Sequence, residues 1–233
     1  KGGGHGDYRQ IVLAPASVQE MADFVKDGFE LAFKYRIPVL ILSDGVIGQM
    51  MEKVELFDPI PRLTDEEIKE KYPWATTGKK SGTERRIITS LDLDSHKMEQ
   101  HNLKLQAKYN EITEKEVRYE LLDCDDAEYL FVAYGSSARI AQKAVKLARA
   151  KGIKAGLFRL ITLFPFPTVK MPEMCGKRIK GFLAVEMSSG QMVEDVQLAV
   201  NGCSKVAHFG RFGGVVHTPE EVLEALEQKI IGG

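Results

Sequence analysis

Two polar side chains near the start of the chain could bind a ligand: His5 and Asp7, which flank Gly6 in a glycine-rich loop. The loop runs directly into an apolar segment typical of a strand, and glycines allow backbone conformations that are closed to other residues. A histidine titrates near neutral pH, and a neighbouring carboxylate favours its charged form. A cationic His5 could attract a carboxylate, so this loop is a candidate substrate or cofactor loop. A plain surface loop would have the same composition.

Two acidic residues follow apolar runs: Asp44 and Glu186. Asp44 lies in Ser-Asp-Gly after the run 39–42, which resembles part of a Gly-Asp-Gly diphosphate motif, where a later Asn completes a magnesium site. The first asparagine, Asn102, comes too late for that role, which favours a turn residue at a strand end. Glu186 follows the run 182–185, at the end of a strand where open α/β sheets bind ligands. It could instead accept hydrogen bonds from backbone amides at a domain interface.

The usual catalytic and metal-binding motifs are absent from the sequence. It contains no GxGxxG, GxxxxGK[ST], HExxH, GxSxG or CxxC, and its five histidines show no ligand spacing. The chain therefore cannot supply an iron–sulfur cluster or a four-cysteine zinc site by itself. Gly135-Ser136-Ser137 after a strand invites a phosphate-binding interpretation, but a tight turn with a serine helix cap is favoured. We assign no catalytic residue and no metal ligand from the sequence.

The composition excludes several classes of protein. Of the 233 residues, 44% are apolar and 28% are charged. The 32 basic residues are nearly balanced by 33 acidic ones. A net charge of −1 gives no drive toward nucleic acid or an anionic membrane surface. No apolar run reaches the roughly 18 residues of a membrane span. The three cysteines lie far apart, so we expect no disulfide framework and a cytoplasmic location, where thiols stay reduced.

The elements that must position these groups fall into three predicted parts. Residues 1–57 contain a strand, a helix and a strand, and such a βαβ unit implies a parallel sheet. Residues 58–126 form a polar linker segment. Residues 127–233 alternate strands and helices, which indicates a second parallel sheet covered by helices. The strands predicted there are 129–133, 155–160, 182–185 and 206–209.

Two helices carry recognisable signals. Ser17 and Glu20 are spaced as a capping box at the start of the first helix. A long, highly charged helix is predicted over 94–120 in the linker segment. Its apolar residues recur every seven positions, at Met98, Leu105 and Ile112. This narrow stripe is suited to lie across another surface.

The beginning of the chain indicates a truncation. The sequence opens on Lys1 without an initiator Met, and its glycine-rich loop leads straight into a strand, as in the middle of a domain. A lone βαβ unit of this size cannot bury a full core. We therefore expect that an N-terminal portion is missing, or that a partner covers the first sheet.

The order of several segments resembles the α subunit of the 2-oxoacid:ferredoxin oxidoreductases. The segments that carry this resemblance are 5–7, 12–20, 35–39, 44–52, 159–167, 186–190, 210–214 and 218–221. The last four lie in a part similar to the transketolase C-terminal domain. The likeness is greatest to the branched-chain (2-oxoisovalerate) type, through Gln-Met-Met-Glu at 49–52 and the segments 87–91 and 117–120.

The resemblance implies an α/β fold, with the C-terminal part of a pyrimidine-type thiamine diphosphate domain over 1–57 and a transketolase C-terminal-like domain over 127–233. It implies a hetero-oligomeric complex that oxidatively decarboxylates a 2-oxoacid to acyl-CoA and passes electrons to ferredoxin. Thiamine diphosphate and Mg²⁺ would be held mainly by a partner β subunit, and iron–sulfur clusters by a ferredoxin-like δ subunit. Further implied partners are a γ subunit, ferredoxin and coenzyme A, with no nucleic acid and no membrane. The isolated chain is expected to be inactive, and to bind neither thiamine diphosphate nor a metal tightly.

Other interpretations stay open. The chain could belong to a 2-oxoglutarate- or pyruvate-specific member of the same family. It could be part of another thiamine enzyme, in which the long charged helix would be an unusual insertion, or a non-catalytic interaction module on a transketolase-like fold. The resemblance carries over no catalytic residue, because the family's catalytic Glu, Thr and Arg precede the segment that matches 5–7.

Overall fold

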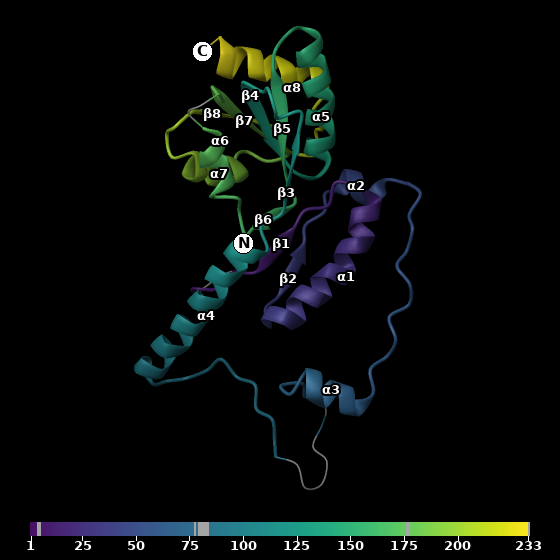
Figure 1. Cartoon of the computed structure of the whole chain (residues 1–233), viewed down its shortest axis with the longest axis vertical. Helices are drawn as coiled ribbons and strands as arrows, with labels where there is room; N and C mark the ends of the chain where they lie inside the picture. Colours follow the sequence, from purple (N-terminus) through teal and green to yellow (C-terminus); the bar gives the residue numbers. More distant parts are fainter. Residues whose placement is uncertain (4–5, 77, 79–83, 176–177, 233) are drawn as a thin grey trace. The chain divides into compact units, whose positions relative to one another are not determined.

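The computed structural model of the chain describes residues 1–3, 6–76, 78, 84–175 and 178–232. Two compact units can be told apart along the ribbon (Figure 1). One consists of Lys1–Glu55 together with Leu105–Gly233, and the other of Leu56–Lys104. The first unit contains two sheets, one of three strands and one of five.

The five-stranded sheet has the strand order β3-β5-β4-β7-β8. Its strands are β3 (Tyr119–Leu122), β4 (Tyr129–Ala133), β5 (Ala155–Leu160), β7 (Gly181–Glu186) and β8 (Lys205–Gly210). β4 pairs in parallel with β5 and β7, and β7 pairs in parallel with β8. β3 instead runs antiparallel to β5 at the edge of the sheet. The parallel α/β fold expected of the C-terminal part is confirmed, and one antiparallel edge strand adds to it.

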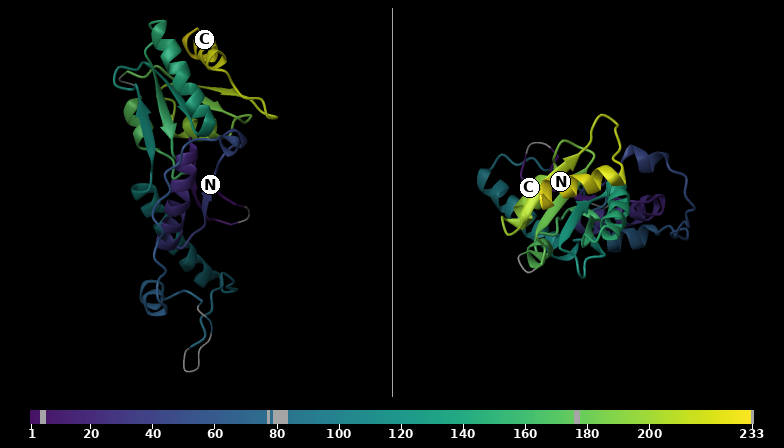
Figure 2. Two further views of the ribbon diagram at one scale, coloured as in Figure 1. Left: turned by 90° about the vertical axis from the view of Figure 1, so that its right-hand side faces the viewer. Right: turned by 90° about the horizontal axis from the view of Figure 1, so that it is seen from above.

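Helices cover both faces of this sheet (Figure 2). One face carries α5 (Gly135–Ala150), α8 (Pro219–Leu226) and the short π-helix η1 (Glu227–Ile231), and the other α6 (Lys170–Met174) and α7 (Met192–Val200). Side chains of a strand point alternately to its two faces. In β4, Phe131 and Ala133 therefore pack with α5 and α8, whereas Leu130 and Val132 pack with α6 and α7. The core thus forms two layers, one on each side of the sheet.

The three-stranded sheet has the order β2-β1-β6. It consists of β1 (Ile11–Leu13), β2 (Val39–Ile41) and β6 (Thr162–Phe164), and α1 (Val18–Tyr35) connects the first two. β1 and β2 are parallel, which confirms the predicted βαβ unit, but β6 joins β1 in antiparallel orientation. The sequence did not predict β6. Residues 155–164 thereby supply a strand to each sheet in turn.

The capping box predicted at the start of α1 is only half formed. The Ser17 hydroxyl accepts a hydrogen bond from the Glu20 amide, as expected. The Glu20 carboxylate accepts one from the amide of Ala16 rather than Ser17. The reason is that Glu20 also binds Arg159 of β5, which draws its carboxylate toward the five-stranded sheet.

The described residues of the second unit hold little regular structure. It contains α3 (Asp65–Lys71), which begins at Thr64 with a complete capping box to Glu67, and the N-terminal half of α4 (Ser95–Lys115). None of the helices in the described ranges is long and apolar enough to cross a membrane.

α4 corrects the long helix predicted over 94–120. It begins one residue later than predicted but ends at Lys115, because Tyr119–Leu122 pair with β5 as strand β3. Two members of the predicted apolar stripe reach the core of the first unit: Ile112 is fully buried, and Leu105 packs beside it.

The cysteines also differ from the expectation. Cys175, at the end of α6, forms a disulfide with Cys203, which lies between α7 and β8; their Cα atoms are 5.8 Å apart. The sequence predicted no disulfide framework, and it did not predict this single pairing. The two residues are 28 positions apart in the sequence, but the path through β7 and α7 returns the chain to the same edge of the sheet. Cys124 is a free thiol, and burial raises its pKa to about 11.

Candidate functional site

Asp44 lies at the end of the β2 segment and begins the short helix α2 (Gly45–Gln49). Its Oδ1 accepts hydrogen bonds from the amides of Val46 and Ile47, both at 3.0 Å. Its Oδ2 accepts a bond of 2.9 Å from the amide of Ser136, in the first turn of α5. One carboxylate therefore satisfies amides at the starts of two helices, where negative charge is favourable.

Gly135 makes this contact between Asp44 and α5 possible. Its φ of 58° lies in the left-handed region, and a Cβ at this position would come within 2.8 Å of Asp44 Oδ2. The predicted turn after β4 is present, but the helix cap is Tyr134, which makes no side-chain capping bond. The serine cap favoured from the sequence is therefore wrong, because the Asp44 carboxylate from another element takes that place.

Glu186 ends β7 and is almost completely buried, with 1% of its surface exposed. Its Oε2 accepts hydrogen bonds from the amides of Gln191 and Met192, and its Oε1 accepts one of 3.1 Å from Val193. The hydroxyl of Ser188 donates a further bond of 2.7 Å. Glu186 thus accepts hydrogen bonds from backbone amides at the start of α7, the helix that follows β7 in the chain.

Two further side chains gather around these carboxylates. Burial, together with the charges of Glu186 and Asp44, raises the pKa of Tyr134. His208 Nε2 lies 3.4 Å from Glu186 Oε1. The cluster of Asp44, Tyr134, Glu186 and His208 therefore lies at the carboxyl edge of the sheet, the edge at which ligands bind in open α/β folds.

A serine and a histidine meet beside this cluster. Ser137 Oγ lies 3.2 Å from His217 Nε2, and only 3% of each residue is exposed. Burial lowers the pKa of His217, which favours its neutral form. His217 Nδ1 has no hydrogen-bond partner in the described part of the chain, so no acid orients the ring as a catalytic triad requires. The pair is a buried packing contact at the start of α5.

Of the two candidate residues in the N-terminal loop, the structure describes one. His5 lies outside the described residues. Asp7 is exposed, and its backbone carbonyl accepts a hydrogen bond of 3.3 Å from Gln106 of α4. The structure thus places Asp44 and Glu186 close enough for their charges to act on Tyr134, and it places Asp7 beside α4.

The described residues do not form a magnesium–diphosphate site. All the bonds that Asp44 makes go to backbone amides, and they engage both of its oxygens. Within the described ranges, no group of three or more His, Cys, Asp or Glu side chains could hold a metal ion. The site holds helix ends in place and offers no ready set of metal ligands.

Sequence reasoning missed three residues that the structure places at important contacts: Tyr134, His208 and Arg159. Arg159 carried a visible signal, since it is the one charge in the otherwise apolar strand Ala155–Leu160. It is 8% exposed and binds the carboxylates of Glu20 and Glu120. Tyr134 directly precedes the noted Gly-Ser-Ser turn, whereas His208 had no signal beyond its place in a strand.

Two family models match the chain. "Pyruvate flavodoxin/ferredoxin oxidoreductase, thiamine diP-bdg" matches residues 5–120, and "Pyruvate:ferredoxin oxidoreductase core domain II" matches residues 127–222.

Sequence relatives point the same way. The ketoisovalerate oxidoreductase subunit VorB of Methanothermobacter thermautotrophicus is 48% identical over 231 residues, and the 2-oxoglutarate synthase subunit KorA of Methanocaldococcus jannaschii is 34% identical over 247. These alignments include 98% and 99% of this chain, but 62% and 65% of the relatives. The chain therefore spans less than two thirds of the length of these relatives.

Two solved structures share the fold. One is 2-oxoglutarate:ferredoxin oxidoreductase from Magnetococcus marinus with 2-oxoglutarate, coenzyme A and succinyl-CoA bound; its TM-score is 0.75 at 22% identity, covering 97% of this chain and 43% of that chain. The other is a split-gene transketolase, an inactive β4 tetramer, with a TM-score of 0.54 at 14% identity over 95% of this chain and 57% of that chain. Both likenesses concern the fold alone, and they confirm the expected transketolase-like architecture.

Proposed function

The chain belongs to the 2-oxoacid:ferredoxin oxidoreductase family, and on this premise we propose that its complex oxidatively decarboxylates a branched-chain 2-oxoacid. The product would be the acyl-CoA, with electrons passed to ferredoxin. One observation carries the choice of 2-oxoisovalerate over 2-oxoglutarate: identity is 48% to a ketoisovalerate oxidoreductase subunit and 34% to a 2-oxoglutarate synthase subunit. A 2-oxoglutarate- or pyruvate-specific enzyme is the alternative within the family.

The proposed division of the chain follows the same premise. Residues 1–57 would be the C-terminal part of a pyrimidine-type thiamine diphosphate domain, residues 58–126 a linker segment, and residues 127–233 a transketolase C-terminal-like domain. The end of one family match at 120 and the start of the next at 127 support the second boundary. The complex would be a cytoplasmic hetero-oligomer of this subunit with β, γ and ferredoxin-like δ subunits.

The cofactors of the proposed reaction would be held mainly by other subunits. Thiamine diphosphate with Mg²⁺ would lie on the β subunit. This is supported by Asp44, because both oxygens of its carboxylate already accept hydrogen bonds from backbone amides, three in all. Iron–sulfur clusters would lie on the δ subunit, because the sequence has only three, widely spaced cysteines.

The roles proposed for the candidate residues follow from their contacts. Asp44 and Glu186 would act as positioning residues that fix the starts of α2, α5 and α7 at the edge of the sheet that faces a ligand. Neither is proposed as a catalytic residue. The loop with His5 and Asp7 would attract the carboxylate of the 2-oxoacid.

The experiment that tests the function starts from the full-length subunit, purified with the proteins that co-elute. Coenzyme A-dependent reduction of ferredoxin is measured with 2-oxoisovalerate, 2-oxoglutarate and pyruvate in turn. We expect the highest kcat/KM for 2-oxoisovalerate, and no reduction when coenzyme A or thiamine diphosphate is omitted. A higher kcat/KM for 2-oxoglutarate or pyruvate would overturn the choice of substrate, and no activity with any of them would overturn the function.

The loop is tested in the same complex with His5→Ala. Loss of a cationic side chain that binds the substrate should raise KM for the 2-oxoacid and leave the affinity for thiamine diphosphate unchanged. An unchanged KM would mean that the loop is structural.

A further inference from the structure

A cavity of about 530 Å³ opens beside α5, and its lining includes none of the four residues of the carboxylate cluster described above. Its walls come from the start of α1, from α5 and from strands β3 and β5. Its charged lining consists of Arg139, Lys143, Lys146 and Arg159 with Glu20 and Glu120. Small-molecule sites usually measure about 300–1,000 Å³, so this cavity has the size of a ligand pocket.

Two of the cations in the lining are unpaired. Arg139 binds Glu52 at 2.8 Å, and Arg159 binds both carboxylates of the lining. Lys143 and Lys146 are exposed at the rim of the cavity, and no ion pair or side-chain hydrogen bond joins them to the described part of the chain. They lie three positions apart on one side of α5, where like charges repel each other. An anion between them would relieve this repulsion.

Arg159 provides an independent sign of a missing ligand. Its Nε is buried and has no hydrogen-bond partner in the described structure, although its two other nitrogens bind Glu120 and Glu20. The residue is 8% exposed and lines the cavity. A buried donor without a partner is costly in a folded protein. A ligand oxygen in the cavity would supply that partner.

We propose that this cavity binds a phosphate group, held by the ammonium groups of Lys143 and Lys146 and by Nε of Arg159. A phosphate dianion matches the two unpaired lysine charges, and its oxygens accept charge-assisted hydrogen bonds from several donors at once. The volume exceeds that of one phosphate, so the group can belong to free phosphate or to a phosphate monoester with an organic part.

The test uses the full-length subunit in its purified complex, saturated with thiamine diphosphate and coenzyme A so that sites for their phosphates are filled. Inorganic phosphate and glycerol 3-phosphate are titrated by calorimetry into the wild type and into Lys143→Gln/Lys146→Gln. The matched control is Lys205→Gln, which removes an exposed lysine of β8 that makes no side-chain hydrogen bond or ion pair in the described structure. Glutamine keeps the helix propensity of α5, and unfolding curves show that each variant is folded.

The wild type should bind phosphate saturably, and the double variant should bind it about tenfold more weakly or not at all. Lys205→Gln should bind as the wild type does. Tighter binding of glycerol 3-phosphate than of phosphate would identify an organic phosphate as the ligand, and equal binding would identify free phosphate. The proposal fails if the wild type binds neither probe, or if the double variant binds both as tightly as the control. Either result leaves the proposed activity untouched, because that activity is measured separately.

Discussion

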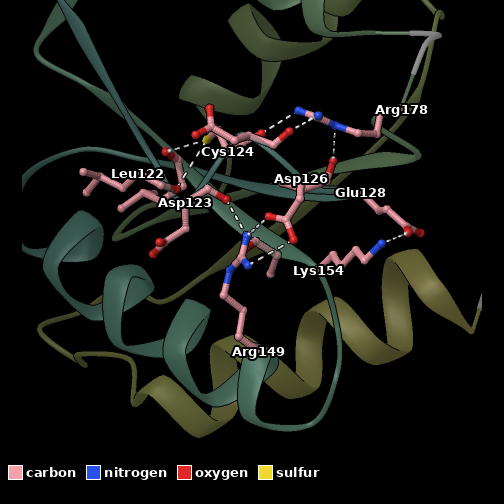
Figure 3. Close-up of polar contacts among 12 residues, drawn as sticks. Leu122, Asp123, Cys124, Asp126, Glu128, Arg149, Lys154 and Arg178 are labelled. Atoms are coloured by element: carbon pink, nitrogen blue, oxygen red, sulfur yellow. Dashed lines mark hydrogen bonds and ion pairs between the residues drawn. The ribbon is translucent and has the colours of Figure 1, made fainter.

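The two edges of the five-stranded sheet are held by side chains of opposite charge. At the carboxyl edge, the carboxylates of Asp44 and Glu186 accept hydrogen bonds from amides at the starts of α2, α5 and α7. At the amino edge, the guanidinium groups of Arg149 and Arg178 donate to backbone carbonyls within residues 123–127, directly before β4 (Figure 3). A disulfide adds a covalent link at the amino edge.

The direction of the chain explains the carboxylates. In a parallel α/β sheet the helices begin at the carboxyl edge with free N–H groups, which carboxylates can satisfy. The carbonyls that Arg149 and Arg178 bind belong instead to the loop between β3 and β4, which has no helix to satisfy its backbone groups. An acid at the carboxyl edge is therefore no sign of catalysis by itself, because the helices that begin there need hydrogen-bond acceptors.

The two edges also differ in how deeply their charged side chains are buried. The largest loss of stability is therefore expected when Glu186 is replaced. Glu186→Ala should lower the free energy of unfolding by about 4 kcal/mol, because three backbone amides and a hydroxyl lose a buried charged partner. Urea unfolding followed by circular dichroism measures the change. The control is Glu194→Ala in α7, an exposed glutamate whose loss should cost less than about 1 kcal/mol. Equal losses in the two variants would mean that burial of Glu186 does not matter.

Loss of the disulfide at the amino edge should have the next largest effect on stability. Cys203→Ser should lower the free energy of unfolding by about 3 kcal/mol, because a closed loop of this length restricts the unfolded chain. The wild type in dithiothreitol serves as the comparison and should match the variant. If the reductant leaves the stability of the wild type unchanged, the two cysteines are not bonded in solution.

Asp44 should matter less than Glu186, since it also accepts three backbone amide bonds but no bond from a hydroxyl, and it is only half-buried. Asp44→Ala should cost about 2 kcal/mol, from the lost cap of α2 and the lost bond to Ser136. Asp44→Asn, which keeps one acceptor oxygen, should lose less. Hydrogen exchange of the Ser136 amide should become faster in the alanine variant, and unchanged protection would show that another group accepts this bond.

The smallest effect is expected at the exposed amino edge. Arg178→Ala should cost about 1 kcal/mol, because water can replace its bonds to the three carbonyls that it binds. Arg178→Lys, with a single point charge, should fall between the wild type and the alanine variant. A loss as large as that of Glu186→Ala would show that exposure does not separate the two edges.

Much of this fold could be predicted from single segments of the sequence. β4, β5, β7 and β8 are short apolar runs closed by turn residues, and α8 begins at Thr218-Pro219 with Glu221 in place for a capping box. β6 could not be predicted, because it is three residues long and its partner β1 is distant, with Leu13 facing Thr162. The first two residues of β3 were assigned to the helix predicted over 94–120 for the same reason, since only the pairing with β5 makes this segment a strand.

The candidate site, too, could be predicted only in part. The positions of Asp44 and Glu186 at strand ends follow from the apolar runs before them. The hydrogen-bond partners of the two carboxylates could not be predicted, because the amides that they bind lie in turns whose conformation does not follow from the sequence. The contact of Asp44 with Ser136 joins residues 92 positions apart, and no local pattern records it.

The antiparallel pair of β1 and β6 also has a consequence for synthesis on the ribosome. β1 is translated early, whereas Thr162, which faces Leu13, follows roughly 10–30 s later at ordinary rates of elongation. Throughout that interval one side of β1 offers unpaired N–H and C=O groups to any other nascent strand. The interval ends when residues 155–164 emerge, and that one stretch then completes a strand in each of the two sheets.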